Sequence, residues 1–367
     1  MVREKGVNSV THINTLLVYL KYCERTVSKH HIAKLAQLSP KKFAKKLSEI
    51  QNNPEMLMSF FSPRSYRIIL DYVLISREMK VINRPFNYLV NHHEKRLIPT
   101  QNLLVAVIEF EGRCFPISMA WWIQECFLDD DEIHQKQTEV SEKMLEKLHQ
   151  MGFQPEVILF DGAFLNASMM GILKELNWPV ICRFPKNRNC FNLGEKQNPK
   201  KLFSERPNGL FYFYKKVGYM SHKRCVYASQ NVEIIVNCNT KEKLNTRDFY
   251  CILNTSELSY TEAFRAYKNR SKIEHMFKIL KSYLGMLGFF RHHQDYLECH
   301  YRSCFSAFIL LQSMAQELNL TMPKTLLFIR KHSLEELNQR LSTLWCDLKQ
   351  IVVGTTFQKT QSLKHIL

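Results

Sequence analysis

The chain has 367 residues and a mass of 43.5 kDa, and 45% of its residues are hydrophobic, which is enough to bury a core and excludes a chain too polar to fold. Its net charge of +17 and pI near 9.3 indicate a polyanionic partner, nucleic acid before a membrane surface. No apolar run is long enough to span a bilayer, and the N-terminus lacks a signal-peptide pattern. We therefore expect a cytoplasmic protein that does not bind membranes.

The positive charge is unevenly distributed along the chain. Residues 1–65 contain eleven Lys and Arg against four Asp and Glu, whereas residues 66–180 contain eleven against sixteen. Residues 181–247 contain fourteen against four, and a further basic block lies at 259–293. Basic segments on both sides of an acidic middle favour a binding track for a polyanion around an acidic centre.

Residues 1–65 predict helices with a basic surface. The segment HHIAKLAQLSPKKFAKKLSEI divides at Leu38-Ser39-Pro40 into two apolar-periodic pieces, which is the spacing of a helix-turn-helix. Ser39 is the expected N-cap of the second piece. Four lysines that follow it are placed to meet DNA phosphates: Lys41, Lys42, Lys45 and Lys46. A plain helical hairpin with a basic face fits the pattern equally well.

From residue 66 the hydrophobic pattern predicts strands. RIILDYVLI is a buried strand that contains one acid, Asp71, and two more strands, NLLVAVIEF and RCFPISMAWW, are joined by a turn at Glu111-Gly112. Helices at about 131–149 and 167–178 alternate with the strands PEVILFD, which ends at Asp161, and PVICRFPKN. The order β-β-β-α-β-α-β predicts an α/β fold with a mixed sheet flanked by helices.

The rest of the chain predicts a basic β-rich segment and a helical end. Residues 187–247 contain the short strands FYFYKKV, RCVYAS and NVEIIVN, which indicate hairpins inserted into the fold. DFYCILN is a last strand, and Ser259 is the expected N-cap of one continuous helix that reaches about Gly285. Further helices are expected at 295–318 and 325–350. The predicted regions are thus 1–65, 66–186, 187–247, 248–320 and 321–367.

The eleven cysteines are scattered through apolar segments and form no C-x-x-C pair, so we expect reduced, buried thiols. Cys299, His300 and Cys304, which follow His292 and His293, match no tight ligand spacing. Ordinary helix residues are therefore a better interpretation of this cluster than a zinc site.

The helix expected after Ser259 has a polar stripe. At 100° per residue, four polar side chains share one face with Lys278 beside them: Tyr267, Arg270, Glu274 and Lys281. Five apolar residues occupy the neighbouring sector and predict the buried face: Ile273, Met276, Phe277, Leu280 and Leu284. Ordinary i,i+4 ion pairs explain the charges of the stripe but not the tyrosine.

The acids of two predicted strands complement this stripe. Asp71 and Asp161 need a compensating cation if they are buried as anions. Together with Glu274 they form a set of oxygen donors that suits Mg²⁺. Two such ions can catalyse an in-line phosphoryl displacement.

The polar stripe fits the pattern Y-x2-R-x3-E-x6-K. In this pattern the chain resembles the bacterial insertion-sequence DDE transposases of the insertion-sequence-four group. The resemblance covers residues 66 to 314 and includes FDGAFLNASMMGILKELNWPVICRFPKNR. It implies an RNase H-like core at 66–186 and 248–320, interrupted by the β-rich insertion at 187–247.

The resemblance also implies roles for individual residues. Asp71, Asp161 and Glu274 would be the catalytic acids that bind two Mg²⁺ ions, which Mn²⁺ can replace. The expected contacts to DNA phosphates are Tyr267, Arg270, Lys281 and Lys278. Members of the family nick an element end, form and reopen a DNA hairpin, and join the end to target DNA as dimers on paired ends. We therefore expect double-stranded DNA with terminal inverted repeats and target DNA as partners, a homodimer, and a place at the bacterial nucleoid.

Several alternatives stay open. Asp71 is followed by Tyr72 and Val73 rather than by the family's usual polar residues, and Glu109 and Glu111 are alternative first acids. Phe249 or Tyr250 is an alternative candidate for stacking on a flipped base, although core packing is the expected role of both. A degenerate copy that only binds DNA, a host nuclease and a DNA-binding regulator are the competing functions.

Overall fold

The computed structural model describes residues 17, 19–21, 63–76, 87–91, 96–128, 134–203, 211–215, 217–240, 242–243, 248–287 and 294–340. The chain divides into two compact units. Unit 1 comprises Met1–Ser62, Tyr72–His134 and Lys272–Leu367, and unit 2 comprises Pro63–Asp71 and Gln135–Ser271. Lys41, Lys42, Lys45 and Lys46 lie outside the described residues, so the predicted helix-turn-helix stays a prediction.

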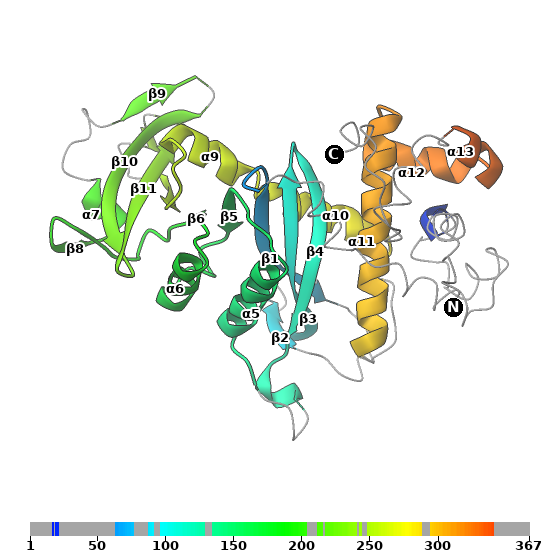
Figure 1. Ribbon diagram of the computed structural model, residues 1–367, viewed down its shortest axis with the longest axis horizontal. Coiled ribbons are helices and arrows are strands. Elements are labelled where there is room, and N and C mark those ends of the chain that lie inside the picture. The colour runs from blue at the N-terminus through cyan, green and yellow to red at the C-terminus, as the bar shows by residue number, and fades with distance from the viewer. Residues whose placement is uncertain are drawn as a thin grey trace, which may run out of the picture. The chain divides into compact units, whose positions relative to one another are not determined.

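Unit 2 is built on a sheet that begins parallel and continues antiparallel (Figure 1). β1 (Arg67–Ser76) pairs in parallel with β5 (Val157–Phe160), and β5 pairs in parallel with β6 (Val180–Arg183). The antiparallel part follows in the order β12 (Tyr250–Asn254), β11 (Gln230–Cys238) and β10 (Gly218–Tyr227). The predicted mixed α/β sheet is thus confirmed.

The predicted β-rich insertion belongs to this same sheet. Hydrogen bonds between β11 and β12 join it to the strand DFYCILN. Short elements complete its far end: β7 (Cys190–Asn192), β8 (Glu195–Gln197), α7 (Pro199–Leu202) and β9 (Tyr212–Tyr214). β7 and β9 both pair antiparallel with β10.

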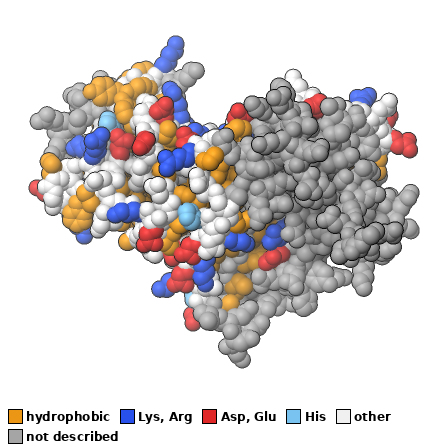
Figure 2. Space-filling view, viewed as in Figure 1, with side chains coloured by type: hydrophobic (Ala, Val, Ile, Leu, Met, Phe, Trp, Pro, Cys, Tyr) orange, Lys and Arg blue, Asp and Glu red, His pale blue; other side chains and the backbone are white. Residues whose placement is uncertain are grey.

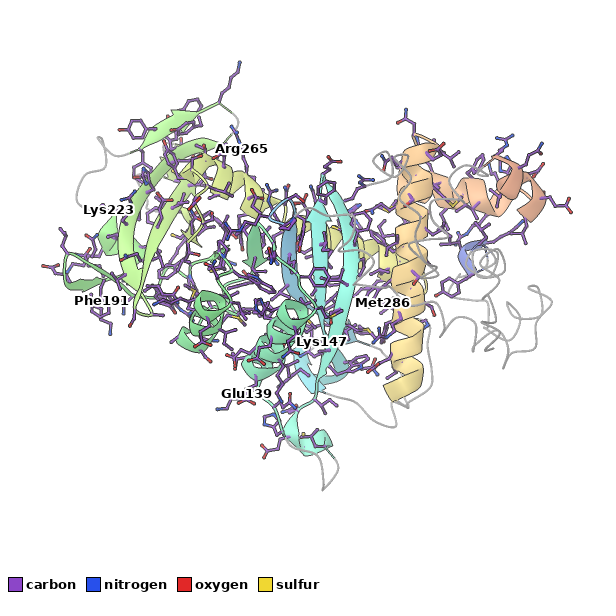
Figure 3. The ribbon with its side chains drawn as sticks, in the orientation of Figure 1. Glu139, Lys147, Phe191, Lys223, Arg265 and Met286 are labelled. Atoms are coloured by element: carbon purple, nitrogen blue, oxygen red, sulfur yellow. The ribbon has the colours of Figure 1, made fainter. Side chains whose placement is uncertain are left out.

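Helices cover the two faces of the sheet in unit 2. In Figure 1, α5 (Gln137–Gln150) and α6 (Ala167–Glu175) lie on one face, and α9 (Tyr260–Lys268) lies on the other, against β6 and β12. Figure 3 labels Glu139, which caps the start of α5 by accepting the Lys136 N–H, and Lys147 in its last turn, where a cation favours the helix dipole. All four residues of β5 are buried, as expected for a strand covered on both faces.

Unit 1 contains an antiparallel sheet and a long helix. β2 (Asn87–Asn91), β3 (Arg96–Phe110) and β4 (Arg113–Trp122) pair in sequence. The predicted turn at Glu111-Gly112 is confirmed, with φ of 48° and 86°, which is the hairpin geometry that a glycine permits. α11 (Gln294–Glu317) packs on β4, and the Gln312 side chain exchanges two hydrogen bonds with the backbone of Cys114.

Other helical elements in the described part of unit 1 include η1 (Glu125–Phe127), α10 (Ser271–Ser282), α12 (Met322–Lys331) and α13 (Leu334–Arg340). The predicted single helix at 325–350 is wrong in its described part, because α12 ends at Lys331 and Ser333 starts a new helix by bonding to Glu336. None of the helices in the described ranges has the length and apolar character needed to cross a membrane.

The cysteines in the described residues agree with the prediction of free thiols. Eight are free, and all of these except Cys126 are buried. His300 and Cys304 pack inside unit 1, where the Cys304 thiol lies 3.8 Å from the His300 ring and 3.5 Å from the Leu284 carbonyl oxygen. These contacts account for the pair as core residues.

Candidate active site

Three charged side chains form a row across the parallel strands of unit 2, at the carboxyl ends of β5 and β6 and in the middle of β1. The β1–β5 register pairs Ile69 with Leu159, and two residues further along each strand are Asp71 and Asp161. The β5–β6 register pairs Phe160 with Cys182, so the next aligned residues are Asp161 and Arg183. Aligned residues of neighbouring strands point to the same face. The carboxyl ends of parallel strands are also where open α/β sheets form their ligand sites.

Gly162 permits the close approach of the chain after β5 to the end of β6. A Cβ atom at position 162 would lie 2.9 Å from the Arg183 carbonyl oxygen and 3.3 Å from the Pro185 ring. Real Cβ atoms do not approach backbone this closely, so any larger residue would push the two strand ends apart. The glycine that follows Asp161 therefore helps to hold this acid beside Arg183.

Asp71 forms an ion pair with Arg270. The Arg270 guanidinium donates to the Asp71 carboxylate at 2.8 Å, and the two side chains are 15% and 18% exposed. A charge-assisted hydrogen bond in a largely shielded position is stronger than a surface ion pair. The cation that the burial of Asp71 requires is thus supplied by the protein itself.

The helix that precedes Arg270 ends sooner than predicted. The N–H groups of Asn269 and Arg270 bond to the carbonyls of Ala266 and Tyr267, three residues back, and this tight turn ends α9. α10 then begins at Ser271. The prediction of one continuous helix is therefore wrong, and Tyr267 does not share a helical stripe with Glu274 and Lys281. The Asn269 side chain has low helix propensity, which agrees with a break at this point.

Tyr267 is buried among the charged groups of the row rather than exposed in a groove. Burial raises the pKa of its phenol above the ordinary value, and the contact with the Tyr250 hydroxyl and the charge of Asp161 raise it further, whereas Arg270 lowers it. The Tyr250 and Tyr267 oxygens are 3.4 Å apart. Tyr267 is thus a neutral hydrogen-bonding group close to Asp161 and Arg270.

One residue of this site, Arg183, was missed by the sequence analysis, and it contacts Tyr250, which the sequence analysis considered for base stacking. The Arg183 guanidinium lies 5.4 Å from the centre of the Tyr250 ring, a cation–π contact. Tyr250 is 37% exposed, whereas its neighbour Phe249 is buried and packs on Phe203, as expected for a core residue. Successive residues of a strand point to opposite faces, and this alternation separates Tyr250 from Phe249.

The other residues of the predicted motif lie on α10 in unit 1. Glu274 and Lys278 are exposed, and the apolar face predicted for this helix is buried. The Lys281 ammonium donates to the Leu74 carbonyl at 2.7 Å, and burial lowers its pKa. Because Glu274 belongs to unit 1 and the two aspartates belong to unit 2, the meeting of the three acids stays a prediction.

The alternative first acids have structural partners in unit 1. Glu109 is only 3% exposed, and its carboxylate accepts from the Lys272 ammonium at 2.8 Å and from the Gly112 N–H at 3.1 Å. Glu111 lies in the exposed turn and pairs with Arg113 at 3.4 Å. Both acids thus have partners in unit 1, and the choice of first acid stays a prediction.

The donor set suits a hard cation in its chemistry. Asp71 and Asp161 offer carboxylate oxygens, and Mg²⁺ is commonly held by one or two carboxylates plus water and phosphate oxygens. In the part of the chain that the structure describes, no group of three or more His, Cys, Asp or Glu side chains is placed to hold a metal ion.

The described surface around these elements is mixed in charge. Figure 2 shows Lys and Arg side chains interspersed with acidic and apolar side chains on the coloured part of the visible face.

A scan against protein-family models gives no match to this chain, and a search of curated proteins gives no significant match.

Proposed function

We propose that this chain is a DNA transposase of the insertion-sequence type that cuts and joins transposon ends by metal-dependent phosphoryl transfer. The observation that carries the proposal is the alignment of Asp71 and Asp161 on adjacent parallel strands, with Arg270 and Tyr267 of the Y-x2-R-x3-E-x6-K pattern against them. Asp161 and Arg270, which follow Asp71 in the sequence by about 90 and 200 residues, thus contribute to the same site.

The strand arrangement supports an RNase H-like core. An antiparallel β3–β4 hairpin precedes the parallel strands β5 and β6, and β1 pairs in parallel with β5. Helix α6 connects β5 to β6, and the first two predicted acids stand within β1 and directly after β5. The proposed third acid is Glu274 on α10.

The side chains of unit 2 suit the chemistry of a phosphodiester. Asp71 and Asp161 provide oxygen ligands for Mg²⁺, which when bound would activate a nucleophile and stabilise the leaving oxygen. Arg270 and Arg183 can neutralise phosphate oxygens, and the neutral phenol of Tyr267 can donate a hydrogen bond to one. The proposed partners are double-stranded DNA that carries terminal inverted repeats, target DNA, and a second copy of the chain.

A second candidate is a copy that binds DNA without cutting it. The Asp71 carboxylate is engaged by Arg270, and Asp71 is followed by Tyr72 and Val73 rather than by polar residues. An acid held in this way by a cation is less available as a metal ligand. The ion pair bears on the choice between the two candidates, because only an active enzyme needs the Asp71 carboxylate to leave Arg270 and bind a metal ion.

A cleavage assay tests the proposal. A plasmid that carries the coding sequence with its natural flanking DNA is incubated with the purified chain and Mg²⁺, and the products are separated on denaturing gels. Nicks at the element ends, hairpin ends and joined products are expected for a transposase. Cleavage without joining would indicate a nuclease. DNA binding without any cleavage would overturn the enzymatic proposal and favour the DNA-binding copy.

A further inference from the structure

The Arg270 guanidinium is engaged by a carboxylate in the place where a phosphate could bind it. Its N–H donor lies 2.8 Å from the Asp71 carboxylate, and the Arg270 and Asp71 side chains are only 15% and 18% exposed. Carboxylate and phosphate oxygens are alternative acceptors for the same fork of guanidinium N–H groups. Both residues belong to unit 2. Asp71 therefore occupies a cation that has the chemistry to bind a phosphodiester.

The other arginine of the row is not held in this way. Arg183 is the exposed last residue of β6, and its guanidinium lies over the Tyr250 ring. Among the residues that the structure describes, no carboxylate forms an ion pair with Arg183. The row thus contains one accessible arginine and one whose charge is compensated by an acid of the same row.

The two partners of the ion pair differ in how firmly they are held. Asp71 lies within β1, two residues after Ile69, which is paired with Leu159 of β5. Arg270 lies in the turn between α9 and α10, where its N–H bonds to the Tyr267 carbonyl. An arginine side chain also has many more rotamers than an aspartate side chain. When the pair opens, the guanidinium therefore moves and the carboxylate stays in the row.

We propose that the Asp71–Arg270 ion pair is an autoinhibitory contact, in which Asp71 withholds Arg270 from phosphodiesters. The inference rests on the proposed function and concerns the regulation of the same site. The Asp71 carboxylate releases Arg270 when it binds a divalent cation, and Arg270 releases Asp71 when it binds a phosphate oxygen. Either event opens the same contact, so each prepares the chain for the other.

The contact makes the two binding events cooperative. A first ligand must open the ion pair, whereas a second ligand meets a pair that is already open, and by linkage the advantage is the same in either order. The coupling is limited by the equilibrium between the closed and the open pair. For a hydrogen bond between charged groups that solvent partly screens, this limit is on the order of five- to thirtyfold.

Arginine labelling tests the contact in the full chain. The protein is treated with phenylglyoxal, which reacts with accessible guanidinium groups, and the modified peptides are quantified by mass spectrometry. In EDTA, Asp71→Asn should raise the labelling rate of Arg270 by at least about fivefold, because a neutral amide holds the guanidinium less strongly. Asp161→Asn is the matched control, since it removes the neighbouring carboxylate of the row, and it should change this rate by less than about twofold. Arg265, which is exposed on α9 and marked in Figure 3, is the internal reference.

The same measurement on the wild-type chain tests the link to metal binding. Exchange of EDTA for Mg²⁺ should raise the labelling rate of Arg270 toward that of Asp71→Asn. In Asp71→Asn itself, Mg²⁺ should have no further effect on this rate, because the contact is already open. The wild-type result is sufficient by itself if Asp71→Asn fails to fold.

DNA binding provides a readout from the other partner of the pair. Fragments of the plasmid used in the cleavage assay are labelled with fluorescein, and binding in EDTA is followed by anisotropy. Asp71→Asn should tighten binding by about fivefold, because Arg270 no longer has to leave an acid. This gain should disappear when both proteins also carry Arg270→Ala. A mere loss of negative charge would act in either background.

The inference is overturned if Arg270 is labelled at equal rates in the wild type and in Asp71→Asn, or if Mg²⁺ leaves the wild-type rate unchanged. A gain in DNA affinity that persists with Arg270→Ala would also overturn it. None of these readouts measures cleavage. A chain that cuts DNA but shows none of the expected changes refutes the autoinhibitory contact alone. A chain that shows them without cutting DNA refutes only the enzymatic part of the proposed function.

Discussion

Asp71 and Glu109 are both acids on strands, and each is held by a cation at 2.8 Å, but their surroundings differ. Glu109 in unit 1 is almost completely buried and accepts a second hydrogen bond from the Gly112 N–H. Asp71 retains more exposure and lies within β1, aligned with Asp161, which directly follows the adjacent strand β5. Two acids with equally short ion pairs can therefore serve different purposes.

The groups that surround the two carboxylates differ. The Glu109 carboxylate ties Lys272 to the turn of a hairpin, where an unpaired charge would be costly. Placing Asp71 beside a second carboxylate is unfavourable for stability alone, because like charges repel. Arg270 and Arg183 offset this repulsion in the structure, and under the proposed function a metal ion would take over that role, whereas Lys272 compensates Glu109.

The largest effect should come from Asp161. Asp161→Asn keeps the shape of the side chain but removes its charge, and we expect cleavage of plasmid DNA to fall at least about a thousandfold, since metal ions supply several kcal/mol of transition-state stabilisation. Binding of the same DNA, measured by fluorescence anisotropy, should change by less than about threefold because phosphate contacts dominate affinity.

Glu109→Gln is the matched control, since it removes a strand acid outside the row. Its cleavage rate per folded molecule should equal that of the wild type. Wild-type cleavage by Asp161→Asn, or loss of cleavage in Glu109→Gln, would remove the distinction between the two acids.

Much of this arrangement could be predicted from local sequence patterns. The apolar strands, the turn at Glu111-Gly112 and the acid at the end of PEVILFD follow from hydrophobic period and turn chemistry. The N-cap at Ser259 is confirmed by its capping box with Glu262, in which each residue satisfies a backbone N–H of the other.

What could not be predicted depends on partners far away in the chain. The break between α9 and α10 accompanies the ion pair of Arg270 with Asp71, a residue 199 positions earlier. The place of Arg183 in the row depends on the register between β5 and β6, and a shift of one residue would turn its side chain to the other face. Hydrophobic pattern alone does not specify either feature.

The second-largest effect should be a loss of stability when Glu109 in unit 1 is replaced. Glu109→Ala leaves the Lys272 ammonium without this carboxylate, and we expect the free energy of unfolding to fall by about 2–3 kcal/mol, less than the full value for a buried pair because the Lys272 side chain is 31% exposed. Urea titration followed by circular dichroism measures it. Glu111→Ala, at the exposed turn, should change stability by less than about 0.5 kcal/mol. Equal losses in both variants would contradict a structural role specific to Glu109.

A smaller loss is expected when Arg270 is removed. Arg270→Ala should lower the free energy of unfolding by about 1–2 kcal/mol, because a hydrogen bond between charged groups is lost while solvent partly screens Asp71. A double-mutant cycle with Asp71→Asn isolates the pair. A coupling energy near zero would show that the contact contributes nothing to the fold. In that case Asp71 would be no more tied to Arg270 than an ordinary surface acid.

The smallest effect at neutral pH should come from Tyr267→Phe. The hydroxyl contact with Tyr250 is long, at 3.4 Å, so its loss should change the free energy of unfolding by only about 0.5 kcal/mol. Its influence should grow at alkaline pH. Because the folded state raises the pKa of Tyr267 above the ordinary value of 10.0, the neutral phenol is favoured in the fold. The contribution of the Tyr267 phenol to the free energy of unfolding is fully present below about pH 10 and is lost as the pH rises further.

Tyr267→Phe should therefore weaken the alkaline loss of stability, measured by urea titration at several values between about pH 8 and 11, a range that spans the ordinary pKa of tyrosine. Tyr212→Phe is the control, because Tyr212 is exposed on β9 and its removal should leave the pH dependence unchanged. If both variants behave alike, Tyr267 is not held as a neutral group beside Asp161, and the row of charged side chains loses the hydrogen-bond donor that distinguishes it from the Glu109 pair.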